Sequence, residues 1–591
     1  MKKQGSELMK TLLTTLNSKF IHSSLALRYL WQYNKKQFEG ISIEEYTINN
    51  DLDYILSEIY TKDYDLVCFS CYIWNFEETL EIAKNLRKVN KEVKILLGGP
   101  EVSYDPKAVL EECDYIDYII FGEGELTLNE LLNLLINNRG NIFNIRGLAF
   151  REKNKIYMNE ERCLIEDLDI IPFPYENLKE LENRIIYYES SRGCPFNCQY
   201  CLSSTFRGVR YFSMNRIKRD LKKFIDADVK QVKFVDRTFN ADKEHCLEIM
   251  KYLQKIDNGR INFHFEITAY LLDEEILDFL RSVRKGLFQF EVGVQSTYEK
   301  TLREIKRNMD FKRIKYVINE LVSFNNIHLH LDLIAGLPYE DYGTFLKSFD
   351  DVYSLKPNKI QLGFLKLLKG SGIRMNHYKY GYIYKDEQPY EVMCNDYITY
   401  DEILKLKYIE EMTDEYYNSH NFDFSVDYII KKFYKNPSSF FEDLSVFWRN
   451  MGYHHVSHGR NQLFKILIEF FKQNNFDNED VFMEILKFDY LRNKNANLPE
   501  FFNSIEIDDF KNRCHKFLQN EENIEKYLPM YKGMTAKKII KKVHFETFKY
   551  DILYLANNYY EDISKQESII LFNYEVDNND FEKSEYFRVS I

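Results

Sequence analysis

The sequence predicts an α/β protein in three parts: an N-terminal Rossmann-like doubly wound parallel sheet, a central partial (β/α)6 barrel of the TIM type, and a mainly α-helical C-terminal domain. Strand-like apolar runs alternate with helical stretches in the first 140 residues, and again between residues 185 and 400. After residue 400 helical periodicity prevails. Because parallel strands need helical crossovers, both alternating regions favour parallel sheets.

The N-terminal alternation opens with a buried strand at residues 11–15, a loop, and a helix that begins near Leu25. The strands and helices that follow in this part are expected at residues 41–48, 53–60, 65–73, 76–89, 94–99 and 115–124. Ligands of such sheets lie beyond the carboxyl ends of the strands.

A linker follows, with hairpin-like strands at residues 145–159 and a segment at 167–178 in which two prolines exclude continued helix or central strand. The six barrel strands are expected at residues 185–193, 229–236, 262–270, 287–296, 328–338 and 359–368. In such barrels the chemistry gathers at the carboxyl ends of the strands.

The C-terminal third has helical runs, at residues 402–418, 460–473 and 480–491 among others, and a strand-like ending near residue 568. A chain of 591 residues is too long for one core. We therefore expect four segments, which are a sheet domain at residues 1–140, a linker at 141–184, a barrel at 185–400 and a helical domain at 401–591.

The net charge of −12 and the sequence pI near 5.7 provide no global positive field, so nucleic acid is an unlikely partner. The best local basic run, Lys537–Lys542, fits an amphipathic helix with a solvated basic face better than an RNA contact. No apolar run has the roughly 18 residues that span a bilayer, and no secretory signal is evident, so we expect a cytoplasmic protein without a membrane span.

The strongest chemical signal is the CxxxCxxC run of Cys194, Cys198 and Cys201, directly after a predicted strand. Three thiolates in one short loop can hold three irons of a [4Fe–4S] cubane and leave the fourth iron open to an outside ligand. The alternative is a structural zinc site completed by His245 or Cys246, but zinc sites usually pair cysteines as CxxC. Three clustered cysteines in so long a chain also fit a reducing compartment.

The run CPFNCQYC after SSRG resembles the radical S-adenosylmethionine (SAM) superfamily over residues 185–400. The resemblance implies that the three cysteines ligate the cluster and that Tyr200 lies beside the adenine of SAM. Glu291–Ser296 resembles the fourth-strand segment of that superfamily, which implies Gln295 and Ser296 as polar SAM contacts. Asp332–Pro338 resembles the fifth-strand segment that packs by the adenine, where Leu337 lies.

One segment departs from the superfamily. Phe234–Asn240 stands where a Gly-Gly-Glu motif often binds the methionine amino group, so Asp236 or Thr238 would have to substitute. Asp236 is equally well explained as a helix N-terminal cap.

The first 140 residues resemble the cobalamin-binding domain that precedes the barrel in one branch of this superfamily, through segments 69–75, 97–103 and 121–125. Glycines there would let the backbone approach a bulky ligand, and a serine offers a hydroxyl at a strand end. The implied cobalamin contacts are Ser70, Gly98, Gly99, Pro100, Glu101, Gly122 and Glu123.

Alternatives remain for this N-terminal site. The glycines also suit a flavin or nucleotide, and Glu123 and Glu125 also suit a solvated turn. The DxHxxG motif of corrinoid proteins is missing, so His22 receives no metal role and we expect cobalt with no histidine below it. We expect a loop, and no metal site, at His454, His455 and His458.

The resemblance implies a cobalamin-dependent enzyme that uses a 5′-deoxyadenosyl radical and methylcobalamin to methylate an unactivated carbon. Two alternatives are radical rearrangement, cyclisation or redox chemistry without methyl transfer, and a non-catalytic corrinoid or iron–sulfur sensor. A small-molecule substrate is favoured, an electron donor such as flavodoxin or ferredoxin is implied, and the helical residues 401–591 are the candidate for substrate recognition.

Overall fold

The computed structural model describes residues 9–591 except 206–207, 308, 494–496, 504, 506, 562, 564–565 and 576–583. The chain divides into two compact units. The first comprises Met1–Ile327, Gly336–Glu340 and Phe364–Thr399, and the second His328–Ala335, Asp341–Gly363 and Tyr400–Ile591.

The first unit begins with a parallel sheet whose strands take the order β2-β1-β3-β4-β5. These strands are β1 (Thr11–Asn17), β2 (Ile41–Thr47), β3 (Leu66–Ser70), β4 (Lys94–Gly98) and β5 (Tyr118–Ile120). The helices are α1 (Leu25–Asn34), α2 (Leu52–Thr61), α3 (Phe76–Val89), α4 (Pro100–Ser103), α5 (Pro106–Glu112) and α6 (Gly124–Asn137).

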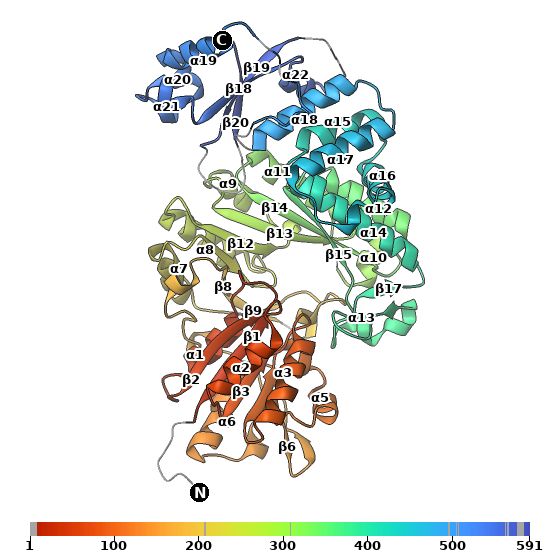
Figure 1. Cartoon of the computed structure of the whole chain (residues 1–591). Coiled ribbons are helices and arrows are strands. Elements are labelled where there is room, and N and C mark those ends of the chain that lie inside the picture. The colour runs from red at the N-terminus through yellow and green to blue at the C-terminus, as the bar shows by residue number, and fades with distance from the viewer. Residues whose placement is uncertain are drawn as a thin grey trace. The chain divides into compact units, whose positions relative to one another are not determined.

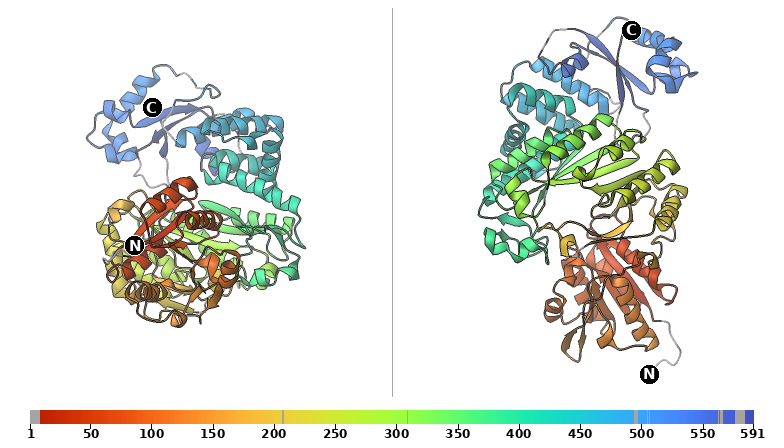
Figure 2. Two further views of the ribbon diagram at one scale, coloured as in Figure 1. Left: turned by 60° about the horizontal axis from the view of Figure 1, so that its bottom comes forward. Right: turned by 180° about the vertical axis from the view of Figure 1, so that it is seen from behind.

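Helices cover both faces of this sheet (Figures 1 and 2). On one face α2, α3 and α5 contribute to the core, and on the other α1 and α6 do so. The predicted doubly wound parallel sheet is confirmed.

The hairpin expected in the linker forms as β6 (Leu148–Glu152) and β7 (Lys155–Met158). Because β6 pairs antiparallel with β5, the first sheet has seven strands and runs to Met158. The first part of the segment that we expected as a linker therefore belongs to the sheet, while the domain boundaries themselves stay a prediction.

Four barrel strands of the first unit pair in parallel in the order β8-β11-β12-β13. They are β8 (Ile186–Tyr188), β11 (Gln231–Phe234), β12 (Asn262–Ile267) and β13 (Phe288–Gln295). The intervening helices are α7 (Met214–Asp226), α8 (Lys243–Ile256), α9 (Glu274–Arg281), α10 (Glu299–Glu304) and α11 (Phe311–Phe324).

Residues 364–399 complete the first unit with α13 (Gly372–Met375), the 3₁₀ turn η6 (His377–Tyr380), and the antiparallel pair β16 (Ile383–Tyr384) and β17 (Val392–Cys394).

The second unit holds β14 (His328–Ala335), α12 (Tyr342–Tyr353) and most of β15 (Lys359–Phe364). All six strands predicted for the partial barrel therefore form, in the predicted order along the chain.

The helices of the last third are α14 (Tyr400–Thr413), α15 (Asp423–Phe433), α16 (Pro437–Asn450), α17 (Arg460–Gln473), α18 (Glu479–Asn493), α19 (Phe510–Gln519), α20 (Glu521–Tyr527), α21 (Ala536–Ile539) and α22 (Ile552–Asn557). An antiparallel sheet of β18 (Val543–Phe548), β19 (Ser568–Asn573) and β20 (Glu585–Val589) accompanies them.

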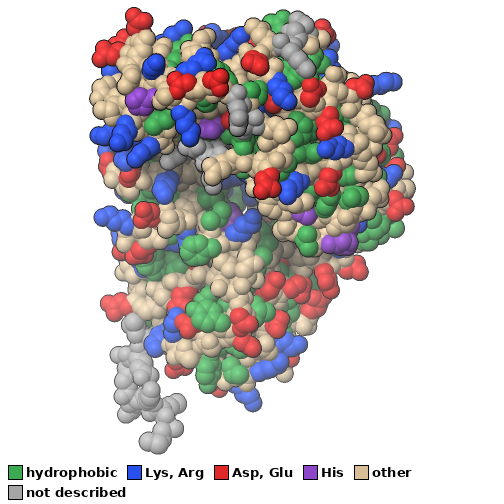
Figure 3. All heavy atoms as spheres, turned by 45° about the horizontal axis from the view of Figure 1, so that its top comes forward, with side chains coloured by type: hydrophobic (Ala, Val, Ile, Leu, Met, Phe, Trp, Pro, Cys, Tyr) green, Lys and Arg blue, Asp and Glu red, His purple; other side chains and the backbone are tan. Residues whose placement is uncertain are grey.

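The mainly helical character of the last third is confirmed, with more strand than the single ending we expected. The amphipathic helix expected at Lys537–Lys542 is wrong beyond its first turn, because α21 ends at Ile539 and the chain then enters β18. Among the described residues, no helix combines the length and apolar character needed to cross a membrane. Acidic and basic side chains are interspersed on the face shown in Figure 3.

Candidate active site

The cysteine loop is held by a short antiparallel ribbon of β9 (Ser191–Cys194) and β10 (Gly208–Tyr211). Gly193 has φ +106°, and a Cβ there would lie 2.1 Å from the carbonyl oxygen of Gly208. Only glycine fits this close approach of two backbones. The ribbon thereby starts the loop at Cys194, the last residue of β9.

The three thiols of the loop are free of disulfide bonds, and Cys198 is buried. The Sγ of Cys194 lies 3.7 Å from the hydroxyl of Thr238, and the Sγ of Cys198 lies 3.7 Å from Arg307 Nη1. Burial raises the pKa of the Cys198 thiol, while the Arg307 charge opposes that rise. Three free thiols, one of them beside a cation, suit an anionic iron–sulfur cluster.

Among the described residues, no three His, Cys, Asp or Glu side chains are grouped closely enough to hold a metal ion. The assignment of the cluster ligands therefore rests on the motif and its place in the fold. Of the residues considered for a zinc site, Cys246 is fully buried in α8 and donates to the carbonyl of Lys243, and His245 lies 3.4 Å from the Ser190 hydroxyl.

Arg307 joins the cysteine loop to the barrel. Its guanidinium donates to the Tyr200 hydroxyl at 3.1 Å and to the carbonyl of Gly293 in β13. Burial raises the pKa of Tyr200 well above its usual range. No sequence motif marks Arg307, which lies more than 100 residues after the cysteines.

Gln295 is the predicted SAM contact that the structure supports best. Its φ is +69°. A Cβ built on Gly293 would lie only 2.2 Å from the side-chain amide nitrogen of Gln295, so this side chain folds over the glycine. Its Oε1 is buried without a hydrogen-bond partner among the described residues. A buried acceptor without a donor is costly unless a ligand supplies one.

Ser296 and Leu337 are both fully buried. The Ser296 hydroxyl donates to Glu340 at 2.6 Å and accepts from the backbone NH of Tyr298. It already has partners within the protein. The assignment of Tyr200, Gln295, Ser296 and Leu337 to SAM stays a prediction.

Charged side chains gather on β11, β12 and β13, on the strand faces opposite the buried Phe263 and Phe265. Lys233 lies 2.8 Å and His264 3.0 Å from the carboxylate of Glu291. Burial alone would raise the pKa of Glu291, but the bond from His264 and the charge of Lys233 lower it to about 2. No motif in the sequence assigns a role to these three residues, which form a polar layer below the strand ends.

Asp236 does not cap a helix, so that structural alternative is wrong. Asp242 caps α8 instead. Asp236 is buried after β11 and accepts from the backbone NH and hydroxyl of Ser190 and from the hydroxyl of Ser191. It fastens the ribbon that carries the cysteines to the end of β11, and a SAM contact by Asp236 or Thr238 stays a prediction.

The N-terminal sheet reverses its winding between β1 and β3, and ligands of such sheets bind beyond the carboxyl ends of the two strands at this point. Ser70 ends β3 here, in register with Gly98 of β4. The Tyr72 and Trp74 rings stack with centroids 4.4 Å apart, and Trp74 is 42% exposed. The stacked pair follows the carboxyl end of β3, and Trp74 is its exposed member.

The three glycines predicted at this edge differ in their surroundings. Gly99 has φ +106°, and a Cβ there would lie 2.6 Å from the carbonyl oxygen of Cys71, so its close approach is to the protein itself. A Cβ on Gly98 would make ordinary contacts. Gly122 has φ +79°, and a Cβ there would meet no atom within 4 Å, so its side is open.

Glu101 follows Pro100, the first residue of α4, and is 2% exposed. Its carboxylate accepts from Lys369 at 2.9 Å and from the hydroxyl of Tyr390 and the amide of Gln388. Residues 364–399 therefore hold the turn after β4.

Glu123 and Glu125 form no solvated turn, so that alternative is wrong. Arg192 contacts Glu125 at 2.6 Å, Glu189 at 2.8 Å and Glu123 at 3.2 Å, and Arg210 adds a bond to Glu123. These bonds outweigh burial and lower the pKa of Glu123. Whether Ser70, Gly98, Gly99, Pro100, Glu101, Gly122 and Glu123 contact cobalamin stays a prediction.

Arg192 stands two residues before Cys194 on β9. Its bonds to Glu123 and Glu125 therefore join the start of the cysteine loop to the turn after β5. No periodicity in the sequence indicates a pair separated by 67–69 residues.

The remaining predictions for histidines concern His22 and the group of His454, His455 and His458. His22 Nδ1 lies 2.7 Å from the Tyr187 hydroxyl. The predicted loop at His454, His455 and His458 is confirmed, because a single 3₁₀ turn at Tyr453–His455 leads into an irregular segment.

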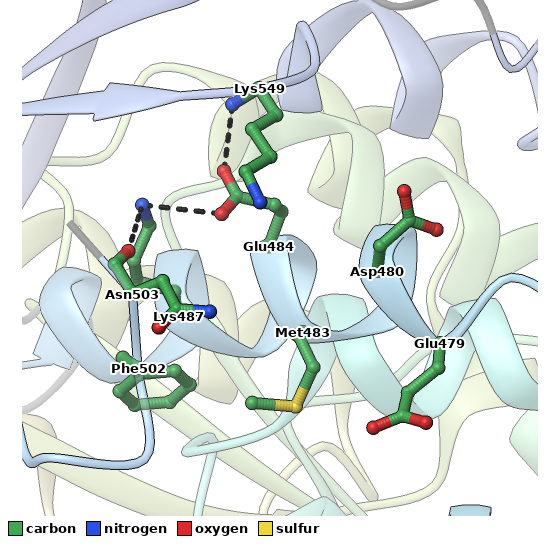
Figure 4. A pocket seen from close by; sticks show the side chains of 8 residues that line it. All are labelled: Glu479, Asp480, Met483, Glu484, Lys487, Phe502, Asn503 and Lys549. Atoms are coloured by element: carbon green, nitrogen blue, oxygen red, sulfur yellow. Dashed lines mark hydrogen bonds and ion pairs between the residues drawn. The ribbon is translucent and has the colours of Figure 1, made fainter. Parts of the chain in front are cut away.

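A hollow of about 300 Å³ lies in the second unit (Figure 4). It is lined by Glu479, Asp480, Met483, Glu484, Lys487, Phe502, Asn503 and Lys549. The Lys487 ammonium there donates to the carbonyls of Thr547 and Asn503 and lies 3.4 Å from Glu484. Its buried cation is thus satisfied by the protein, and the hollow contains none of the predicted site residues.

Three protein-family models match separate parts of the chain. The B12 binding domain matches residues 12–132, the radical SAM superfamily matches residues 188–352, and a protein of unknown function, DUF4080, matches residues 378–572. The first two matches imply cobalamin, SAM and a [4Fe–4S] cluster as cofactors.

Curated relatives share part of the chain. An uncharacterized methyltransferase of Pyrococcus horikoshii is 32% identical over 32% of this chain and 42% of the relative. The cobalamin-dependent radical SAM methyltransferase TokK of Streptomyces tokunonensis is 26% identical over 48% and 44%. An anaerobic magnesium-protoporphyrin IX monomethyl ester cyclase of Rubrivivax gelatinosus is 27% identical over 51% and 57%. The chain covers less than two thirds of each.

Two solved structures share the fold. The radical SAM methyltransferase TsrM of Kitasatospora setae has a TM-score of 0.56 at 16% identity, covering 64% of this chain and 79% of TsrM. The cobalamin-dependent SAM radical enzyme OxsB has a TM-score of 0.58 at 14% identity, covering 82% and 80%.

Proposed function

We propose that this chain, a B12-binding radical SAM protein with a C-terminal region of unknown function, methylates an unactivated carbon of a small-molecule substrate. The observation that carries the proposal is the Arg192 connection, because it brings the carboxyl edge of the B12-binding sheet to the cysteine loop. A methyl donor and a radical source must both reach one substrate carbon, so they must lie close together.

The cofactors, when bound, supply a 5′-deoxyadenosyl radical and a transferable methyl group. The protein holds and orients them. Cys194, Cys198 and Cys201 would ligate the cluster, and the orphan Gln295 oxygen would accept a hydrogen bond from SAM. Ser70, the Gly98–Glu101 turn and Gly122–Glu123 would surround cobalamin, with the Tyr72 and Trp74 rings beside it.

The residues of the barrel bear on the substrate class. Lys233, His264 and Glu291 provide a charged layer, which favours a substrate with polar groups over a hydrocarbon chain. A cytoplasmic location and an electron donor such as flavodoxin or ferredoxin belong to this proposal. The net charge of −12 argues against nucleic acid as the substrate.

The test uses the full chain, reconstituted without oxygen with iron, sulfide and cobalamin, and incubated with SAM that carries a labelled methyl group. Release of 5′-deoxyadenosine over several turnovers, with label recovered on the protein-bound corrinoid, is the expected result. Without 5′-deoxyadenosine the radical assignment is wrong, and a sensor role would replace it.

A second candidate is radical cyclisation or redox chemistry without methyl transfer, since one of the relatives is named a protoporphyrin ester cyclase while the others reported above are named methyltransferases. The same incubation separates the two. Sustained 5′-deoxyadenosine release without label on corrinoid or product supports the second candidate and excludes methyl transfer.

A further inference from the structure

The radical chemistry proposed above needs one electron for each SAM molecule cleaved, so a reduced protein must approach the cysteine loop from outside. Two segments of the first unit contact this loop. The backbone NH of Gln199 donates to the carbonyl of Ile305 at 2.9 Å, and the NH of Ile373 donates to the carbonyl of Gln199 at 2.8 Å. A Cβ on Gly372 would lie 2.4 Å from the side chain of Gln199, so α13 packs directly against the loop.

The same two segments are joined to each other. Lys379 and the hydroxyl of Tyr380, both on η6, contact the carboxylate of Glu304 at the end of α10. Residues 299–306 and 372–380 therefore form one continuous surface around Gln199, and α10 and α13 can be located in Figure 1.

Two apolar side chains on this surface are unusually exposed. Tyr378 is 76% and Met375 is 67% exposed, which makes them the two most exposed large apolar side chains in the described part of the chain. Single exposed apolar residues need no explanation, but a tyrosine and a methionine exposed only three residues apart are typical anchors of protein interfaces.

The charge of the surface differs from that of the chain. Residues 299–306 and 372–380 contain five cations, Lys300, Arg303, Lys306, Arg374 and Lys379, against two carboxylates, Glu299 and Glu304. The chain as a whole carries −12. Arg303 is 77% and Lys379 is 51% exposed, so these charges reach solvent. A local positive surface on an acidic protein steers negatively charged partners toward it.

We propose that Lys300, Arg303, Lys306, Met375, Tyr378 and Lys379 form a docking patch for a small acidic electron-carrier protein of the flavodoxin class. The inference rests on the proposed function. The carrier loses one electron and the cluster gains it, so no atoms are exchanged. Redox partners of this kind meet over small, transient interfaces in which charge sets the encounter and a few apolar contacts fix it.

The test measures binding of oxidised flavodoxin to the reconstituted full chain at low ionic strength. Two double variants separate the two components of the patch: Lys300→Glu with Arg303→Glu, and Met375→Ser with Tyr378→Ser. The matched control is Lys537→Glu with Lys538→Glu, which reverses two exposed cations of the second unit. Iron content and the absorbance of the cluster verify that each variant is intact.

We expect each of the two patch variants to bind flavodoxin about tenfold more weakly than the parent does. Added salt should weaken binding of the parent but hardly change binding of the charge-reversal variant, Lys300→Glu with Arg303→Glu. The control should bind as the parent does. Unchanged binding in both patch variants, or no binding of flavodoxin or a ferredoxin to the parent, overturns the inference.

A second measurement separates this inference from the proposed function. Dithionite, a small reductant, should drive 5′-deoxyadenosine formation equally in the parent and the patch variants, whereas flavodoxin should drive it about tenfold more slowly in the variants. Failure with dithionite in the parent contradicts the radical function. Equal rates with flavodoxin in parent and variants contradict the docking patch alone.

Discussion

Arg192 is surrounded by the carboxylates of Glu123, Glu125 and Glu189 and is 14% exposed. We expect Arg192→Met to lower the free energy of unfolding by roughly 3–5 kcal/mol, because three buried carboxylates lose their shared cation. Denaturant titration of the cofactor-free protein measures this. Arg303→Met is the control, because it breaks an exposed pair with Glu299 and should cost less than about 1 kcal/mol. Equal losses in the two variants would contradict the assigned role of Arg192.

Asp489 is a second residue with a large predicted effect. It is fully buried, and burial raises the pKa of its carboxyl from 3.8 to about 7. The positive charge of Arg492, 3.9 Å away, opposes this rise. The folded state therefore binds a proton that the unfolded state releases near pH 4. The contribution of protonated Asp489 to the stability of the folded state is present below about pH 4 and is lost as the pH rises to 7.

We expect the stability difference between the parent and Asp489→Asn to change across this window by up to about 1.4 kcal/mol per pH unit, with the parent losing stability as pH rises. Urea titrations at several pH values check this. Asp477→Asn, an exposed carboxylate of the same unit, should follow the parent. A parallel pH dependence of parent and Asp489→Asn would show that Asp489 is already charged at low pH.

At the scale of elements, the turn between β4 and α4 depends on Gly99, whose φ of +106° and ψ of 174° are accessible to glycine almost alone. We expect Gly99→Ala to cost roughly 2–4 kcal/mol, from backbone strain together with the clash against Cys71. It should also abolish corrinoid binding, measured by the absorbance of added aquocobalamin.

Gly122→Ala is the matched variant on the neighbouring turn. Its φ is also positive, but its added methyl group meets nothing within 4 Å, so the cost should be about 1 kcal/mol. If Gly122→Ala loses corrinoid binding while it remains stable, the open side of that turn is a ligand contact. Tight corrinoid binding by Gly99→Ala would contradict the proposed site.

At the scale of the whole molecule, the two metal cofactors are assigned to separate elements of the first unit. The triple variant Cys194→Ala, Cys198→Ala and Cys201→Ala should lose the iron–sulfur absorbance and all 5′-deoxyadenosine formation. It should keep the corrinoid affinity of the parent, because the three cysteines lie outside the N-terminal sheet to which corrinoid binding is assigned. Loss of both cofactors would indicate one interdependent site, and retained iron would exclude the cysteines as ligands.

Much of the architecture was predictable because it depends on local patterns. The run of Cys194, Cys198 and Cys201 keeps its chemistry at any place in a fold, and alternation with period 2 or 3.6 marks strands and helices wherever they pack. The six barrel strands and the doubly wound sheet followed from that. The β6–β7 hairpin was also visible, but its pairing with β5 was not, because hydrogen bonding between strands leaves no periodic trace.

The sequence by itself determined the fold class, the cysteine motif and the glycines at the strand ends. Only the tertiary structure decided the partners of Arg192, Glu101 and Arg307, the buried role of Asp236, and the joining of residues 299–306 to 372–380 beside Gln199. The physical reason is that charge pairing and close packing act over a few ångströms in space, between residues that the chain separates by tens to hundreds of positions.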